Sequence, residues 1–130
     1  MLAGCNARTV DFSGADTAAG KELFVKDCGS CHTLADAATA GTVGPNLDDA
    51  FAGARSKSGG DFDKSTFFQI TLDQMRLAAP PMPHFDQKPY NYSEEQLVNV
   101  AAYVAGVAGV TPQQGQQATG GTTAATTTAP

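Results

Sequence analysis

Apolar residues recur at helical spacing most clearly near the C-terminus, in "SEEQLVNVAAYVAGVAG" (residues 93–109). One face of this segment carries five of them: Leu97, Val100, Ala101, Val104 and Ala108. Ser93 and Gln96 have the spacing of a capping box, and two glutamates stand in the first turn, where the helix dipole favours negative charge. With Gly109 as a stop signal, the pattern predicts an amphipathic helix.

Two more helices are predicted upstream of this one. The segment "AAGKELFVKDCGSCH" (18–32) fits a helix capped by Asp16 or Thr17. The segment "STFFQITLDQMRLA" (65–78) fits a helix that is capped by Ser65 and stopped by a pair of prolines.

The segments between these helices read mostly as loops. Residues 33–63 are rich in Gly, Ala and Asp, with one short helix predicted near Leu47 to Ala54. Residues 79–92, "APPMPHFDQKPYNY", hold four prolines and must be extended or turning. The sequence shows neither strand alternation nor an internal repeat, so it predicts an all-α domain with long loops.

The two ends of the chain differ from this central part. Residues 111–130 carry no charge and no aromatic side chain, which is typical of a disordered tail. We therefore predict an N-terminal arm (1–14), one domain (15–109) and a low-complexity tail (110–130). A domain of roughly 95 residues buries a modest core, and a covalently held cofactor would stabilise it.

The pentad "CGSCH" at 28–32 is the place where chemistry concentrates. A disulfide redox pair would need a strand-helix-strand context, and the sequence predicts no strand before it. A zinc site would need two further ligands, and the remaining candidates, Cys5 and His84, do not form a second pair. Both alternatives stay open with little support.

Haem attachment uses the whole pentad. Cys28 and Cys31 are three residues apart, so on one helix face both thiols can reach the vinyl groups on one side of a porphyrin. His32 follows directly and can bind the iron, and Cys-x-x-Cys-His is the attachment signal for c-type haem.

With this pentad the chain resembles the monohaem class I cytochromes c. Gly20, Phe24 and Cys28 have the spacing at which the first helix of that family meets the last, and Tyr103 stands where the last helix supplies an aromatic. Because Gly20 has no side chain, we expect Tyr103 and its helix to approach it closely. The resemblance implies a small all-α fold with about three to five helices wrapped around one covalent haem c.

The resemblance also implies the groups around the iron. Pro45, in "GPNL", would offer its carbonyl to the second ring nitrogen of His32, and Met82, in "PPMPHF", would be the sixth ligand. Met75 reads as a core residue and His84 as a loop residue, and both remain rivals to Met82, as does Met1 on sequence alone.

The N-terminus "MLAGCNA" carries a second resemblance. Leu2 to Cys5 are similar to the lipobox of bacterial lipoproteins, in which the cysteine is acylated, although the rest of a signal peptide is missing. The alternative is that Cys5 is an ordinary cysteine with no lipid attached. Together with haem attachment, which in this family occurs outside the bacterial cytoplasm, the lipobox predicts a lipid-anchored protein in the periplasm or on the outer side of the cytoplasmic membrane.

Charge narrows the possible partners. The formal net charge is −5, and the eight Lys and Arg are scattered without a basic stripe, which argues against nucleic-acid binding. No stretch has the apolar length of a transmembrane helix. Because the ring of lysines found in many soluble relatives is missing, we expect docking through a small apolar patch or onto a basic partner.

The function implied by the resemblance is that of a one-electron carrier in a bacterial respiratory or photosynthetic chain, not an enzyme. Its partners would be redox proteins such as a quinol-oxidising complex, a terminal oxidase or a reaction centre. One alternative is a haem subunit fixed in a membrane electron-transfer complex. Another is a c-type haem peroxidase or gas sensor, which would require that Met82 leave the iron open.

Overall fold

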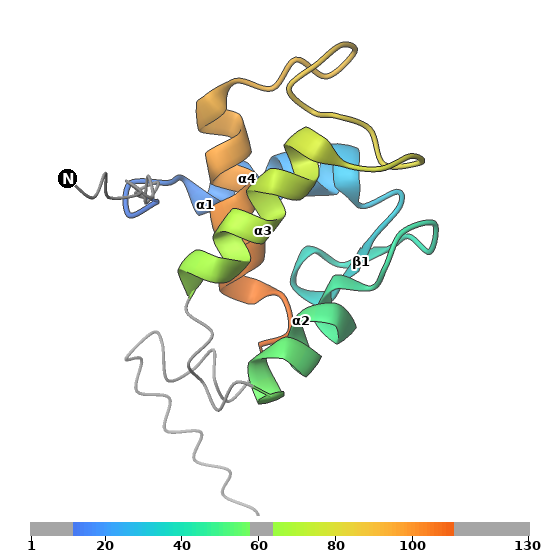
Figure 1. The fold of residues 1–130 in the computed structure, drawn as a ribbon, viewed down its shortest axis with the longest axis vertical. Coiled ribbons are helices and arrows are strands. Elements are labelled where there is room, and N and C mark those ends of the chain that lie inside the picture. Colours follow the sequence, from blue (N-terminus) through green and yellow to red (C-terminus); the bar gives the residue numbers. More distant parts are fainter. Residues whose placement is uncertain (1–11, 58–63, 111–130) are drawn as a thin grey trace, which may run out of the picture.

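Four α-helices dominate the part of the chain that the structure, a computed structural model, describes (residues 12–57 and 64–110; Figure 1). Between α1 and α2 lie a π-helical segment, a 3₁₀ turn and two short strands. The predicted all-α class is confirmed. In chain order the elements are α1 (Thr17–Leu23), η1 (Phe24–Cys28), β1 (Thr33–Leu34), η2 (Ala35–Ala37), β2 (Thr39–Ala40), α2 (Leu47–Lys57), α3 (Lys64–Leu77) and α4 (Glu94–Val107).

Helix α4 has the ends that its sequence predicts. The Ser93 hydroxyl accepts from the Gln96 N–H at 3.2 Å, and the Gln96 side chain accepts from the Ser93 N–H at 2.9 Å, which completes the capping box. Gly109 follows the last turn with a φ of +67°, a left-handed conformation that glycine adopts without steric strain. Both predictions are confirmed.

The first helix differs from its prediction at its C-terminal end. Asp16 is the cap, with its carboxylate accepting from the Ala19 N–H at 3.0 Å. The helix then widens into η1, where the N–H of Gly29 donates to the carbonyl of Phe24 five residues earlier. It ends at Cys28, and the chain turns before His32.

The prediction that both cysteines share one helix face is therefore wrong. The N–H groups of Cys31 and His32 both donate to the carbonyl of Cys28, at 3.1 and 3.0 Å, so the pentad closes in a tight turn. That turn, rather than helical spacing, brings the two thiols to the same side of the molecule.

Two further predictions about local structure need correction. Ser65 lies inside α3, which includes Lys64, so it is not the cap of that helix. The sequence also predicted no strands, whereas β1 and β2 form an antiparallel hairpin with Leu34 paired to Thr39. Each strand is two residues long, which is too short to produce visible alternation of polar and apolar residues.

Helix α1 crosses α4 at Gly20. A Cβ built on Gly20 would lie 2.1 Å from the carbonyl oxygen of Asn99, so the two backbones are in direct contact. The prediction that the last helix approaches Gly20 closely is confirmed. Tyr103 itself packs edge-to-face on Phe24, one turn further along, with 6.0 Å between ring centroids.

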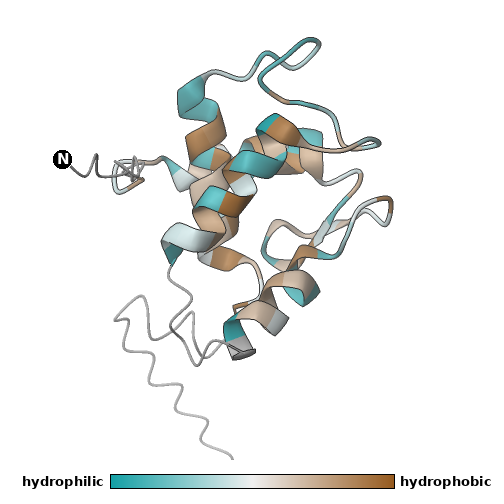
Figure 2. Cartoon of the chain, in the orientation of Figure 1, coloured by the Kyte–Doolittle hydropathy of each residue, from teal (hydrophilic) through white to brown (hydrophobic). Residues whose placement is uncertain are grey.

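Helix α3 packs on the other side of α4, as Figure 1 shows. Figure 2 shows apolar residues along α4 and on parts of α3, while the loop before α4 is largely hydrophilic. The largest buried side chains form one core: Phe24, Leu34, Phe67, Phe68, Leu72, Met75, Leu97, Val100 and Val104.

Helix α2 is tied to the end of α4 by side-chain hydrogen bonds. The Asp48 carboxylate accepts from the N–H of Gly109 at 2.9 Å and from the N–H of Ala35 at 2.8 Å. The Arg55 guanidinium donates to the carbonyls of Ala105 and Ala108, at 2.7 and 2.9 Å. It thereby supplies hydrogen bonds to carbonyl groups at the C-terminal end of α4. The predicted short helix near Leu47 to Ala54 is confirmed and runs three residues further.

None of the helices in the described ranges has the length and hydropathy of a membrane span. The predicted low-complexity tail beyond residue 110 and the arm up to residue 11 lie outside the described residues.

We expect Gly20→Ala to destabilise the protein by about 1–3 kcal/mol, because the new methyl group forces two backbones apart. The measurement is guanidinium unfolding followed by far-ultraviolet circular dichroism. Gly53→Ala is the matched control, since a Cβ there meets nothing within 4 Å, and it should leave stability unchanged or raise it by up to about 1 kcal/mol. Equal stability of Gly20→Ala and the parent chain would contradict the close-contact account.

Candidate functional site

Two adjoining cavities, of about 280 and 230 Å³, lie between the turn after η1, helix α3 and the loop that follows α3. They share five lining residues and so form two lobes of one crevice: Cys28, His32, Pro45, Gln74 and Met82. The outer lobe adds Asp27, Cys31, Val43, Gly44, Pro81 and Tyr90, among others. The inner lobe adds a mostly apolar wall that includes Phe24, Leu47, Ile70, Met75, Val100 and Val104.

His32 lines both lobes and is held by a hydrogen bond to the backbone. Its Nδ1 lies 2.8 Å from the carbonyl oxygen of Pro45, which is the contact that the resemblance implied. A carbonyl can only accept, so Nδ1 carries the proton and donates it. In the neutral ring the other nitrogen, Nε2, then keeps a free lone pair, which is the form of imidazole that binds a metal.

Gly44 fixes the same imidazole from its flat side. A Cβ on Gly44 would lie 2.4 Å from Cε1 and 2.8 Å from Nδ1 of His32. The N–H of Gly44 also donates to the carbonyl of Cys31 at 2.7 Å, which ties this segment to the pentad. The sequence motif "GPNL" predicted a role for Pro45 only. The contact of Gly44 with the imidazole was not predicted, although the glycine before the proline could have indicated a close approach.

The hairpin holds the backbone of the pentad. The Thr39 hydroxyl donates to the carbonyl of His32 at 2.9 Å and accepts from the N–H of Leu34 at 3.1 Å. His32 is thus fixed by its ring nitrogen, by the face of its ring and by its own carbonyl. A side chain held in this way would move little if it bound a metal whose charge changes.

The two cysteines of the pentad both line the outer lobe as free thiols. Burial raises the pKa of the Cys28 thiol to about 12, and the negative charge of Asp27 adds to this effect. At neutral pH Cys28 is therefore a neutral thiol, whereas a disulfide-exchange pair depends on a low-pKa thiolate. This disfavours the redox-pair alternative.

The zinc alternative gains nothing from the geometry. Within residues 12–57 and 64–110, no three or more His, Cys, Asp or Glu side chains gather in a way that could hold a metal ion.

Three candidates for a sixth ligand occupy different places. Met82 is half-buried and lines both lobes, as His32 does. Met75 is 2% exposed and lines the inner lobe. His84 lines neither lobe of the described crevice; its Nε2 donates to the carbonyl of Ala78 at 3.0 Å. Met1 and the acylation candidate Cys5 lie outside the described residues.

A comparison with protein families gives a match to the family described as Cytochrome c, over residues 17–108. The chain belongs to the cytochrome c family. The match includes every residue that lines the crevice. A comparison with curated proteins gives no match.

Membership in this family means that the chain carries haem c, held covalently, with iron at its centre, and that it works as a haem-binding electron carrier. The crevice fits that group. It combines two thiols, an imidazole with a free Nε2, and apolar walls suited to a macrocycle.

Haem should stay on this cytochrome c under denaturing conditions, because thioether bonds to Cys28 and Cys31 survive detergent and heat. After expression with haem-maturation machinery, a denaturing gel stained for haem should show colour at the protein band. The double variant Cys28→Ala/Cys31→Ala should give a colourless band. A colourless band for the parent chain would refute covalent attachment.

Proposed function

We propose that this cytochrome c is a one-electron carrier whose haem iron is bound by His32 and Met82. The observation that carries the proposal is the hydrogen bond from His32 Nδ1 to the Pro45 carbonyl, which leaves Nε2 free toward the crevice. Met82 is the methionine that lines both lobes together with this imidazole. A His/Met pair is the usual arrangement for electron transfer, because the thioether favours the reduced metal.

The loop that carries Met82 is braced against α3. The N–H of Phe85 donates to the carbonyl of Met75 at 2.9 Å, and the carbonyl of Phe85 accepts from the N–H of Tyr92 at 2.8 Å. The N–H of Met82 itself donates to the carbonyl of Ala79 at 3.2 Å. A backbone fixed in this way supports a weak axial bond better than a free loop does.

Met75 is the poorer candidate because its side chain is part of the core packing. It is 2% exposed and belongs to the same buried cluster as Phe67, Phe68 and Leu72. His84 is held by the carbonyl of Ala78 and lies outside the crevice walls. These placements favour Met82.

When bound, haem supplies an iron that changes by one electron between the ferric and ferrous states. His32 and Met82 would hold the iron, the apolar inner lobe would keep water away, and the Pro45 carbonyl keeps the His32 proton on Nδ1. Because both ligands would stay bound before and after transfer, little would rearrange. A filled coordination sphere also leaves no position for a substrate, so we propose no enzymatic activity.

We propose that redox partners dock on an apolar rim at the mouth of the crevice. Val43 is 66% exposed and Pro81 is exposed, and both line the outer lobe. Ile70 is exposed and lines the inner lobe. The proposed partners are a quinol-oxidising complex, a terminal oxidase or a reaction centre. The protein would reach them either as a mobile shuttle or as a subunit of a fixed complex.

We further propose an extracytoplasmic location with an acylated Cys5 as the anchor. Support comes from the lipobox-like "LAGC" and from the maturation of c-type haem outside the bacterial cytoplasm. Several acyl chains anchor a protein firmly, whereas one anchors it weakly.

Met82→Ala should lower the midpoint potential by on the order of 100 mV or more, a part of the roughly 0.8 V range that axial ligands cover. It should also allow carbon monoxide to bind to the reduced protein. The matched control is Met75→Ala, which should reduce stability by about 2–5 kcal/mol without either effect. The same pair of effects on Met75→Ala, with Met82→Ala silent, would reassign the ligand.

Replacing Cys5 by Ser in the full precursor should move the protein from the membrane fraction to the soluble fraction of a bacterial host. Immunoblots of the two fractions make the measurement, with haem staining to show that the domain still matures. A parent chain found entirely in the soluble fraction would refute the anchor.

A further inference from the structure

Asp27 places a carboxylate in the wall of the crevice. Its side chain is 15% exposed, and it stands on η1 immediately before Cys28. Among the described residues that line the two lobes, it is the only Asp, Glu, Lys or Arg. A carboxylate in a largely apolar wall is screened less by water than one on the surface.

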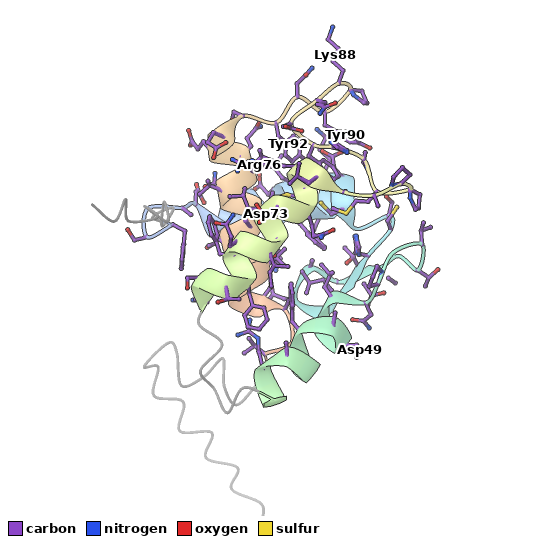
Figure 3. The ribbon with its side chains drawn as sticks, viewed as in Figure 1. Asp49, Asp73, Arg76, Lys88, Tyr90 and Tyr92 are labelled. Carbon is purple, nitrogen blue, oxygen red and sulfur yellow. The ribbon has the colours of Figure 1, made fainter. Side chains whose placement is uncertain are left out.

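A tyrosine from a distant part of the chain holds this carboxylate. The hydroxyl of Tyr92 donates to Oδ2 of Asp27 across 65 residues of sequence. Tyr92 is 8% exposed, and it packs against Phe85 and Tyr90 with ring centroids 5.4 and 6.3 Å away. Figure 3 shows Tyr90 and Tyr92 in the loop before α4, beside the upper end of α3.

The proton of this hydrogen bond stays on Tyr92. Burial raises the pKa of its phenol well above the usual value, and the hydrogen bond to Asp27 raises it further. The hydroxyl is therefore a permanent donor, and a donor stabilises the ionised form of the carboxylate that accepts from it.

The other groups near Asp27 do not cancel its charge. Lys26 Nζ lies 3.9 Å from Oδ2, but the lysine side chain is 73% exposed, and ion pairs in water contribute little. Cys28, next in sequence, carries an uncharged sulfur both as a thiol and as a thioether to haem, and Tyr90 contributes a phenol. The crevice wall thus keeps one negative charge.

We propose that the Asp27 carboxylate, held in place by the Tyr92 hydroxyl, sets the reduction potential of the haem by placing a negative charge on the crevice wall. This rests on the proposed function as an electron carrier. The ferric centre carries one more positive charge than the ferrous centre, so a nearby negative charge favours the ferric state and lowers the potential. Asp27 is the tuning group, and Tyr92 is the residue that positions it.

The test is an equilibrium redox titration of the haem-loaded full chain. At neutral pH, Asp27→Asn should shift the ferric-to-ferrous ratio at a fixed ambient potential toward ferrous, by roughly three- to tenfold. A tenfold shift corresponds to about 59 mV for one electron. Asp27→Glu keeps the charge and should restore most of the parent value. Asp73→Asn removes the same charge from an exposed position on α3 that lines neither lobe, and should leave the ratio nearly unchanged.

A second variant tests the role of the hydrogen bond. Tyr92→Phe removes only the hydroxyl that holds the carboxylate on the crevice wall. At neutral pH the potential of this variant should therefore move from the parent value toward that of Asp27→Asn.

The outcomes separate this inference from the function on which it rests. If Asp27→Asn keeps the low-spin spectrum and the parent potential, Asp27 has only a structural role and the inference is wrong, while the electron carrier stands. If the parent chain itself binds carbon monoxide readily, the proposed ligation fails whatever Asp27 does. Should Asp27→Asn fail to load haem, Tyr92→Phe decides: a potential equal to that of the parent chain overturns the inference.

Discussion

The close contact between α1 and α4 is the constraint on which the crevice depends. Gly20 lets the backbone of α1 touch that of α4 at Asn99, and the buried side chain of Asn99 accepts from the N–H of Asp16 at 2.8 Å. One turn further, Tyr103 packs on Phe24 and donates to Asp36 at 2.6 Å, which attaches the hairpin region to the same helix pair. The crossing therefore fixes both the segment that ends in Cys28 and the turn that carries His32.

The pair of helices α1 and α4 leads to the site through three local features: η1, the turn after Cys28 and the hairpin. The widened turn of η1 delivers the chain to Cys28, and the tight turn after it brings Cys31 and His32 to the crevice. The hairpin then returns the chain so that Gly44 and Pro45 meet the imidazole. A rigid histidine on one side and a braced methionine loop on the other suit a reaction in which only an electron moves.

Signals that act within a few residues were readable from the sequence. The capping box at Ser93, the stop at Gly109 and the pentad at 28–32 each depend on near neighbours, and each indicated the right local structure or chemistry. The family resemblance then gave the fold, as well as the contact between His32 and Pro45.

The features that could not be predicted are a change of helix type, two short strands and a contact between residues far apart in the sequence. The switch to η1 changes hydrogen-bond spacing without any change in apolar pattern, so periodicity could not show it. The two-residue strands are linked by the side chain of Thr39, whose hydroxyl bonds to backbone groups of His32 and Leu34. The hydrogen bond between Asp27 and Tyr92 joins a helix end to a loop 65 residues away. The sequence predicts that loop only as irregular structure, so no local pattern indicates the contact.

The absorption spectrum of the haem-loaded protein, recorded oxidised and reduced and extended to the far red, tests the central claim most directly. A six-coordinate carrier with His32 and Met82 on the iron should give sharp low-spin c-type bands and, when oxidised, the weak far-red band of a bond between methionine sulfur and ferric iron. A high-spin spectrum, or one that changes on addition of carbon monoxide or peroxide, would contradict the account, because it would show an open iron.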